Sequence, residues 1–239
     1  MGAIDESYEE PAAAVRGADL VILCTPVGML SPLLSDIAPA LAPGAILTDV
    51  GSTKRSVVTA AEAVLGKGNP FVGSHPMAGS EKRGVQYARA DLYDGAVCIT
   101  TPTPRTHPDA LNAVESFWRM LGMRMSRLSP EQHDLLLADV SHLPHAVAAA
   151  LVAMQQDEAL DLCGKGFLDL TRIAAGDGGL WRDILLDNRE NVRRSVQRLH
   201  QHLDALLQLL EPGREEALKA WLDAAAARRR RMIDLKAPL

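Results

Sequence analysis

The sequence predicts an α/β fold, in which a doubly wound, largely parallel sheet is followed by an all-helical region. Two observations indicate this. Up to about residue 128, short apolar runs typical of buried strands alternate with helical patterns. From Ser129 onward the strand-like runs end, and apolar residues recur every three or four positions. We therefore expect two domains, residues 1–128 and residues 129–239.

In the first half, the continuous apolar run at residues 18–24 is typical of a strand that is covered on both faces. Further strands are expected at residues 45–50, 70–74, 96–100 and 123–125. The helices between them are expected at residues 29–41, 55–65 and 108–121. Because strands and helices alternate at this spacing, the sheet should be largely parallel.

In the second half, helices are expected at residues 141–160, 167–175, 179–210 and 214–233. The third would be one long helix with apolar residues from Leu185 to Leu210 along one face. A long helix with such a face commonly needs a partner to cover it. We therefore expect a homodimer that forms through the helical region.

The composition excludes several classes of protein. Hydrophobic residues make up 47% of the chain and charged residues 23%, which is typical of a soluble globular protein. A net charge of −5 argues against a nucleic-acid-binding protein. No apolar stretch reaches the ~18 residues of a membrane span, and the acidic N-terminus lacks the features of a signal peptide. Three widely spaced cysteines without a CxxC pair fit a reducing, cytoplasmic location.

Polar residues gather in four segments, at residues 25–28, 49–54, 73–81 and 141–145. The first three follow consecutive predicted strands. In a doubly wound sheet, ligands bind beyond the carboxyl ends of the strands. These three segments are therefore expected to line one crevice.

His75 is the strongest single candidate in this crevice, because it directly follows a predicted strand and precedes Pro76. A histidine there could act as a general base near neutral pH, or it could cap a turn through its own hydrogen bonds. Ser52, at the end of the neighbouring strand, favours the functional interpretation.

Other candidates lie in the helical half. His142 and His145 are three residues apart; they could be catalytic, structural or, with no third ligand nearby, less plausibly metal-binding. Arg172 could form an internal salt bridge with Asp169 or anchor a carboxylate. Trp181 is expected to pack, the default for a residue of its type.

Taken together, these segments resemble the prephenate/arogenate dehydrogenase family of tyrosine biosynthesis. The resemblance covers nearly the whole chain. It is carried by residues 18–28, 48–54, 73–81, 141–146 and 169–174, and by Trp181-Arg182-Asp183. It implies a Rossmann-like nucleotide-binding domain followed by a helical dimerisation domain. It also implies oxidative decarboxylation, in which hydride passes from the substrate ring to NAD or NADP.

The resemblance also implies roles for individual residues. His75 would take the proton of the substrate's C4 hydroxyl, Ser52 would orient this histidine and the nicotinamide, and Arg172 would bind the ring carboxylate. Further substrate-binding positions would be His142, His145, Ser80, Glu81, Asp169 and Trp181. The cofactor would contact Thr25, Pro26, Val27 and Ser52, and no metal is implied.

One feature of the family is absent, namely the glycine-rich GxGxxG turn between a strand and a helix. The chain begins where the family's first βαβ unit would already have ended, so the strand at residues 19–24 would expose an apolar edge. Three explanations are open: a truncated start of a complete enzyme, a dimer rearranged to cover that edge, or a non-catalytic dimeric binding module. Preference between prephenate and arogenate, preference between NAD and NADP, and feedback by tyrosine are also open.

Overall fold

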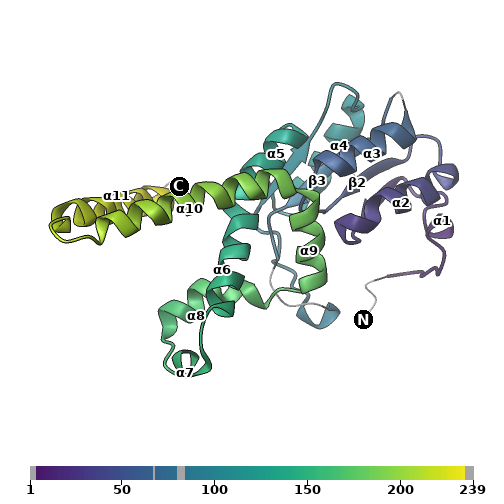
Figure 1. The fold of residues 1–239 in the computed structure, drawn as a ribbon. Helices are drawn as coiled ribbons and strands as arrows, with labels where there is room; N and C mark the ends of the chain where they lie inside the picture. Colours follow the sequence, from purple (N-terminus) through teal and green to yellow (C-terminus); the bar gives the residue numbers. More distant parts are fainter. Residues whose placement is uncertain (1–3, 67, 80–83, 235–239) are drawn as a thin grey trace. The chain divides into compact units, whose positions relative to one another are not determined.

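The computed structural model describes residues 4–66, 68–79 and 84–234, and it divides into two compact units, Met1–Val192 and Arg193–Leu239. In the described part of the first unit, five strands form one sheet in the order β1-β2-β3-β4-β5 (Figure 1). The strands are β1 (Leu20–Leu23), β2 (Ile46–Asp49), β3 (Phe71–Pro76), β4 (Val97–Thr101) and β5 (Arg124–Arg127).

The sheet is largely parallel, as predicted, with one exception. β1 and β2, β2 and β3, and β4 and β5 pair in parallel, whereas β3 and β4 pair antiparallel. A parallel connection needs a crossover, usually a helix. Between Pro76 and Val97 the described residues contain only the 3₁₀ turn Val85–Tyr87. The chain therefore returns alongside β3 in the opposite direction.

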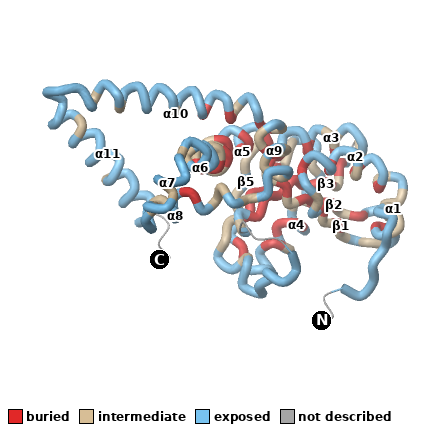
Figure 2. The backbone as a smooth tube through the Cα atoms, turned by 60° about the horizontal axis from the view of Figure 1, so that its bottom comes forward, coloured by how far each residue is buried: buried red, intermediate tan, exposed pale blue. Residues whose placement is uncertain are grey.

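Helices cover both faces of the sheet. α2 (Val27–Ile37) and α3 (Arg55–Leu65) pack on the face that carries Phe71, and α4 (Pro108–Met120) packs on the face that carries Val72 (Figure 1). The short α1 (Pro11–Ala14) lies against α2. Phe71 and Val72 separate in this way because successive strand residues point to opposite faces. The buried residues accordingly concentrate in and around the sheet (Figure 2).

The prediction of one helix at residues 141–160 is wrong at both ends. α5 (Pro130–Leu137) continues through a π-helical turn, Ala138–His142, into α6 (Leu143–Ala153), and α7 (Asp157–Leu160) is separate. The early start has a local cause. The Ser129 hydroxyl accepts a hydrogen bond from the Gln132 backbone, and the Gln132 side chain accepts one from the Ser129 backbone. This reciprocal capping box fixes the beginning of the helix.

The single helix expected at residues 179–210 is also interrupted. After α8 (Lys165–Thr171) and the 3₁₀ turn Arg172–Ala175, α9 (Gly178–Asp187) ends at Asn188, and α10 (Arg189–Leu209) follows. The Asn188 side chain is buried, and its Nδ2 donates a 2.7 Å hydrogen bond to the Asp134 carbonyl oxygen. Asn188, which lies between α9 and α10, is thus hydrogen-bonded to α5.

By length and composition, the helical run Pro130–Ala153 is long and apolar enough to cross a membrane. This differs from the expectation that no apolar stretch of the sequence is long enough for a membrane span. The polar side chains of this run show a different use. His133, Asp134, His142 and His145 are buried within the first unit, and Asp134 accepts hydrogen bonds from the backbone of Lys54 and Arg55. We therefore interpret this run as part of the packed unit.

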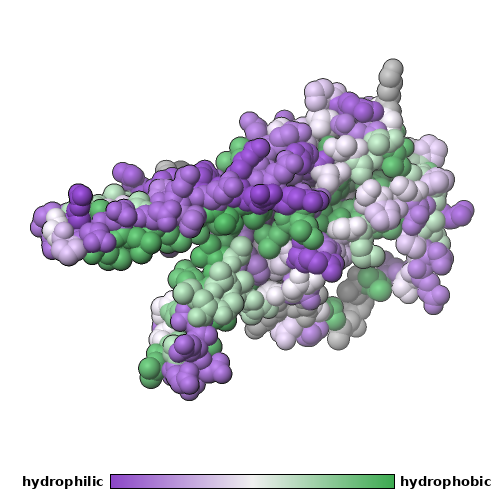
Figure 3. Space-filling view, viewed as in Figure 1, coloured by the Kyte–Doolittle hydropathy of each residue, from purple (hydrophilic) through white to green (hydrophobic). Residues whose placement is uncertain are grey.

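The second unit contains the C-terminal part of α10 and α11 (Glu215–Asp234). Apolar side chains gather along one side of these two helices (Figure 3). The large exposed apolar residues include Val196, Leu203, Leu207, Leu210, Trp221 and Leu222. Exposed apolar surface of this kind is typical of a protein–protein interface. The domain boundary expected at residues 128 and 129 stays a prediction.

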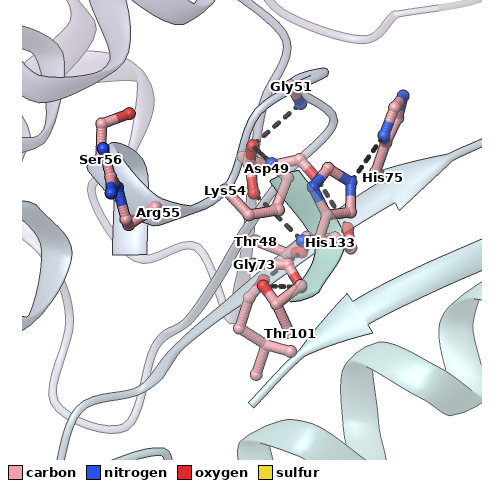
Figure 4. Close-up of polar contacts among 12 residues, drawn as sticks. Thr48, Asp49, Gly51, Lys54, Arg55, Ser56, Gly73, His75, Thr101 and His133 are labelled. Atoms are coloured by element: carbon pink, nitrogen blue, oxygen red, sulfur yellow. Dashed lines mark hydrogen bonds and ion pairs between the residues drawn. The ribbon is translucent and has the colours of Figure 1, made fainter. Parts of the chain in front are cut away.

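A buried ion pair holds the end of β2 in place. The Lys54 ammonium contacts the Asp49 carboxylate, and both side chains are fully buried. Asp49 Oδ1 also accepts a 3.1 Å hydrogen bond from the Ser74 backbone on β3, and Oδ2 accepts one of 2.9 Å from Gly51 (Figure 4). The pair therefore fixes the turn after β2 against the neighbouring strand.

We expect Lys54→Met to lower the free energy of unfolding by about 3–5 kcal/mol, because it leaves the Asp49 carboxylate buried without a cation. Urea denaturation measures the loss. Arg89→Ala is the matched control, since it removes the exposed ion pair with Asp91, and it should cost less than about 1 kcal/mol. Similar losses in the two variants would contradict the importance of the buried pair.

Candidate active site

Two adjoining cavities lie in the first unit, at the carboxyl ends of β1, β2 and β3. The first has a volume of about 410 Å³ and the second of about 440 Å³, and they share Ser52, Leu180 and Ile184. The other residues that line the first include His75, Ser141, Arg172 and Trp181. The second is lined also by Cys24, Thr25, Pro26, Val27, Val50 and Gly51. The predicted crevice is thus present as this pair of cavities.

His75 lies inside β3, so the prediction that it follows the strand is wrong. It pairs with Ile99 of β4, and Pro76 is the last residue of the strand. The His75 side chain is buried yet forms part of the wall of the first cavity. A strand holds its backbone more rigidly than a loop would, so the ring is presented to the cavity from a fixed position.

A chain of hydrogen bonds begins at the His75 ring, and Figure 4 shows its first link, to His133. His75 Nδ1 lies 2.9 Å from His133 Nε2, and His133 Nδ1 lies 2.8 Å from Asp134 Oδ1. Asp134 Oδ1 accepts a 2.8 Å hydrogen bond from the Lys54 backbone, and Oδ2 accepts one of 3.0 Å from the Arg55 backbone. The chain therefore ends on the first turn of α3.

Sequence reasoning missed His133 and Asp134. Fifty-eight positions separate His75 from His133, and nothing local connects the two. The available signal is that the His133-Asp134 pair directly follows Ser129-Pro130-Glu131-Gln132, which is a recognisable helix start. This start indicates that both residues lie in a helix.

The electrostatics of the site favour a neutral base. Burial lowers the pKa of His75 well below its usual value, and the nearby His133, Lys54 and His142 lower it further. Burial also lowers the pKa of His133, although the hydrogen bond to Asp134 opposes this shift. Burial alone would raise the pKa of Asp134, but hydrogen bonds from His133 and the α3 backbone hold it below its usual value. At neutral pH, His75 is therefore uncharged and Asp134 is ionised.

The helical wall is held by close packing around Trp181. The Trp181 ring stacks on His145, with ring centroids 3.6 Å apart and an interplanar angle of 10°. A Cβ atom at Gly176 would lie 2.6 Å from Trp181 Nε1, so any larger residue there would have to displace the Trp181 ring. The Nδ1 atom of the buried His142 lies 3.1 Å from Asn188 Nδ2. Trp181 thus packs, as expected, but also faces the cavity.

The structure brings most of the predicted site residues together. Arg172 reaches the first cavity from the 3₁₀ turn that follows α8, whereas Asp169 is exposed on α8 and lines neither cavity. Ser80 and Glu81 lie outside the described residues. The roles proposed for all of these residues stay predictions.

The second cavity offers a polar group for a ligand. The Thr25 hydroxyl oxygen is buried and has no hydrogen-bond partner among the described residues. Thr25 directly precedes Pro26, the N-cap residue of α2. For a metal the residues are less suitable, since no group of three His, Cys, Asp or Glu side chains in the described part of the chain could hold an ion.

Comparison with known families identifies the chain. Residues 1–127 match the family described as prephenate dehydrogenase, nucleotide-binding domain, and residues 129–224 match prephenate dehydrogenase, dimerization domain. The chain belongs to the prephenate dehydrogenase family. The motifs quoted above for this resemblance fall within these two matched regions.

Individual relatives in the prephenate dehydrogenase family agree. The chain is 34% identical to a prephenate dehydrogenase of Bacillus subtilis, covering 94% of this chain and 62% of the relative. It is 37% identical to a cyclohexadienyl dehydrogenase of Zymomonas mobilis, covering 77% of this chain and 65% of the relative. The chain thus spans somewhat less than two thirds of the length of these curated relatives.

Among solved structures, a similar one is the prephenate dehydrogenase of A. aeolicus in complex with hydroxyphenyl propionate and NAD+. Its TM-score is 0.90 and its sequence identity 38%, and the match covers 97% of this chain and 82% of that one. The Rossmann-like fold with a following helical region is therefore shared with this family member.

Acidification should destabilise the protein through its buried histidines. Burial lowers the pKa of His142 to about 4, whereas in the unfolded chain this side chain titrates near the usual histidine pKa of 6.5. Between these values the unfolded state binds more protons, so stability falls as the pH falls. For His142 alone we expect a loss of roughly 2–3 kcal/mol between about pH 7 and about pH 4.5.

Urea denaturation at both pH values measures this effect. His142→Gln should lose correspondingly less stability on acidification than the unmodified protein does. An equal loss in the two proteins would show that His142 is not the group that titrates.

Proposed function

We propose that this protein catalyses the oxidative decarboxylation of prephenate or arogenate in tyrosine biosynthesis, with hydride transfer to NAD or NADP. The observation that carries the proposal is a neutral, buried His75 in the wall of a cavity that also presents Ser52 and Arg172. An adjoining cavity, which shares Ser52 with the first, leaves room for a second ligand beside it. The names of the relatives described above support the same reaction.

The chemistry requires a base at one position. As hydride leaves C4 of the substrate ring, the hydroxyl on that carbon must lose its proton, and a neutral imidazole is a suitable acceptor. The bond between the ring and its carboxylate then breaks and releases CO2. The electron pair of that bond completes the aromatic ring, and the C4 oxygen takes the proton back from His75 to become the phenol hydroxyl of the product.

The other residues bind and orient. Arg172 offers a guanidinium, whose planar fork suits the ring carboxylate, and so holds the substrate with C4 toward His75. Ser52 borders both cavities and would orient His75 and the cofactor relative to each other. His142, His145 and Trp181 would shape the helical wall. Ser80, Glu81 and Asp169 remain proposed substrate contacts.

Thr25, Pro26 and Val27, together with Ser52, would hold the nicotinamide end of the cofactor, which accepts the hydride when bound. The buried Thr25 hydroxyl fits this role, because a carboxamide can supply the hydrogen-bond partner it otherwise lacks among the described residues. The proposal covers NAD and NADP alike, since these contacts lie far from the ribose that distinguishes them.

The proposal extends to assembly and location. A homodimer formed by the helical region, residues 129–239, would cover the exposed apolar side chains of α10 and α11. Residues 1–128 would form the nucleotide-binding domain. A cytoplasmic location fits the unpaired cysteines Cys24, Cys98 and Cys163.

His75→Asn should lower turnover at least about 100-fold, because the proton acceptor is lost, while the KM for substrate changes only a few-fold. The measurement is NADH or NADPH formation with prephenate and with arogenate. The matched control is His200→Asn, an exposed histidine of α10 that should leave turnover unchanged.

Undiminished turnover in His75→Asn would remove the role assigned to His75. Absence of turnover in the unmodified protein with either substrate and either cofactor would overturn the proposed reaction. If that protein still binds prephenate, the result would favour a non-catalytic dimeric binding module.

A further inference from the structure

We propose that His133 and Asp134 are positioning residues that fix the tautomer of His75, so that its Nε2 atom presents a lone pair to the cavity. The proposal deepens the function proposed above and rests on it. It concerns two side chains of α5 that line neither cavity and reach the reaction only through His75.

The chain of hydrogen bonds starts from Asp134, which is fixed in place and in charge. Its two oxygens accept hydrogen bonds from two backbone N–H groups at the start of α3. These two hydrogen bonds and the one from His133 hold the pKa of the Asp134 carboxyl below its usual value. An ionised carboxylate can only accept hydrogen bonds. The 2.8 Å contact with His133 Nδ1 therefore requires that this nitrogen carries a hydrogen.

The direction of the next bond follows. Because burial keeps the pKa of His133 low, its ring is neutral, and a neutral imidazole protonated at Nδ1 has a lone pair at Nε2. This Nε2 atom lies 2.9 Å from His75 Nδ1, which must then donate. His75 is also neutral, so its remaining nitrogen, Nε2, is unprotonated. The two rings therefore have one possible arrangement of hydrogens, with Nδ1 protonated and Nε2 unprotonated in both His133 and His75.

The opposite arrangement would disable the base. If His75 carried its hydrogen on Nε2, it would offer a donor to the substrate hydroxyl and could not take that proton. His133 is fully buried and Asp134 nearly so, so water does not compete for these contacts. The two residues thus select the reactive tautomer, as the aspartate of a serine-protease triad does for its histidine.

Two substitutions of His133 separate this role from a structural one. His133→Phe fills the space but offers no acceptor, and it should lower kcat about 100-fold while KM changes less than about 3-fold. His133→Gln carries an amide oxygen that can accept from His75 Nδ1, and it should recover kcat to within about 10-fold of the unmodified protein. Thermal unfolding of each variant verifies that it is folded.

The tautomer itself is measured on the unmodified protein by ¹⁵N NMR of labelled histidine, with the His75 signals assigned by their loss in His75→Gln. The expected result is a protonated Nδ1 and an unprotonated Nε2 for both His75 and His133. The reverse pattern would overturn the proposal, and so would equal kcat values in folded His133→Phe and the unmodified protein. Because NMR requires no turnover, failure of the proposed reaction alone would leave the tautomer result standing.

Discussion

Lys54 is held at both of its ends, and the candidate site depends on this arrangement. Its ammonium group meets the buried Asp49 at the end of β2, and its backbone N–H donates to Asp134 on α5. Asp49 in turn accepts from the backbone of β3, directly before His75. One residue therefore links two strands of the sheet to the helix that supports the base. Its charge also lowers the pKa of His75.

Much of the first half could be predicted because its strands are continuous apolar runs that turn residues interrupt. The antiparallel pairing of β3 and β4 could not be predicted, because it depends on how residues 77–96 return, and that segment has no apolar pattern. The break at Asn188 was missed for a different reason. The apolar period continues across it, and only the contact with the Asp134 carbonyl, far away in sequence, shows why the helix stops.

The residues of the candidate site also fall into two groups, those that the sequence predicts and those that it does not. Ser52 and His75 stand out because each lies in a polar segment at the edge of an apolar run, and Arg172 because it is a charged residue flanked by apolar ones. The structure places all three around one cavity. His133 and Asp134 stand in an ordinary helix start, and their importance comes only from contacts with β3 and α3. Residues that act through another residue leave no local pattern, and their partners are set by the fold as a whole.

The π-helical turn Ala138–His142 changes which side chains share a face. In a regular helix each residue rotates by about 100°, so Asp134 and His142, eight positions apart, would point about 80° away from each other. A π turn takes up roughly one additional residue, which reduces the difference to about 20°. Asn188 contacts the backbone carbonyl of Asp134 and the ring of His142. A helical wheel drawn for residues 130–153 therefore assigns wrong directions to the residues after the π-helical turn. It places Asp134 and His142 on different faces, although the folded chain puts them on nearly the same face.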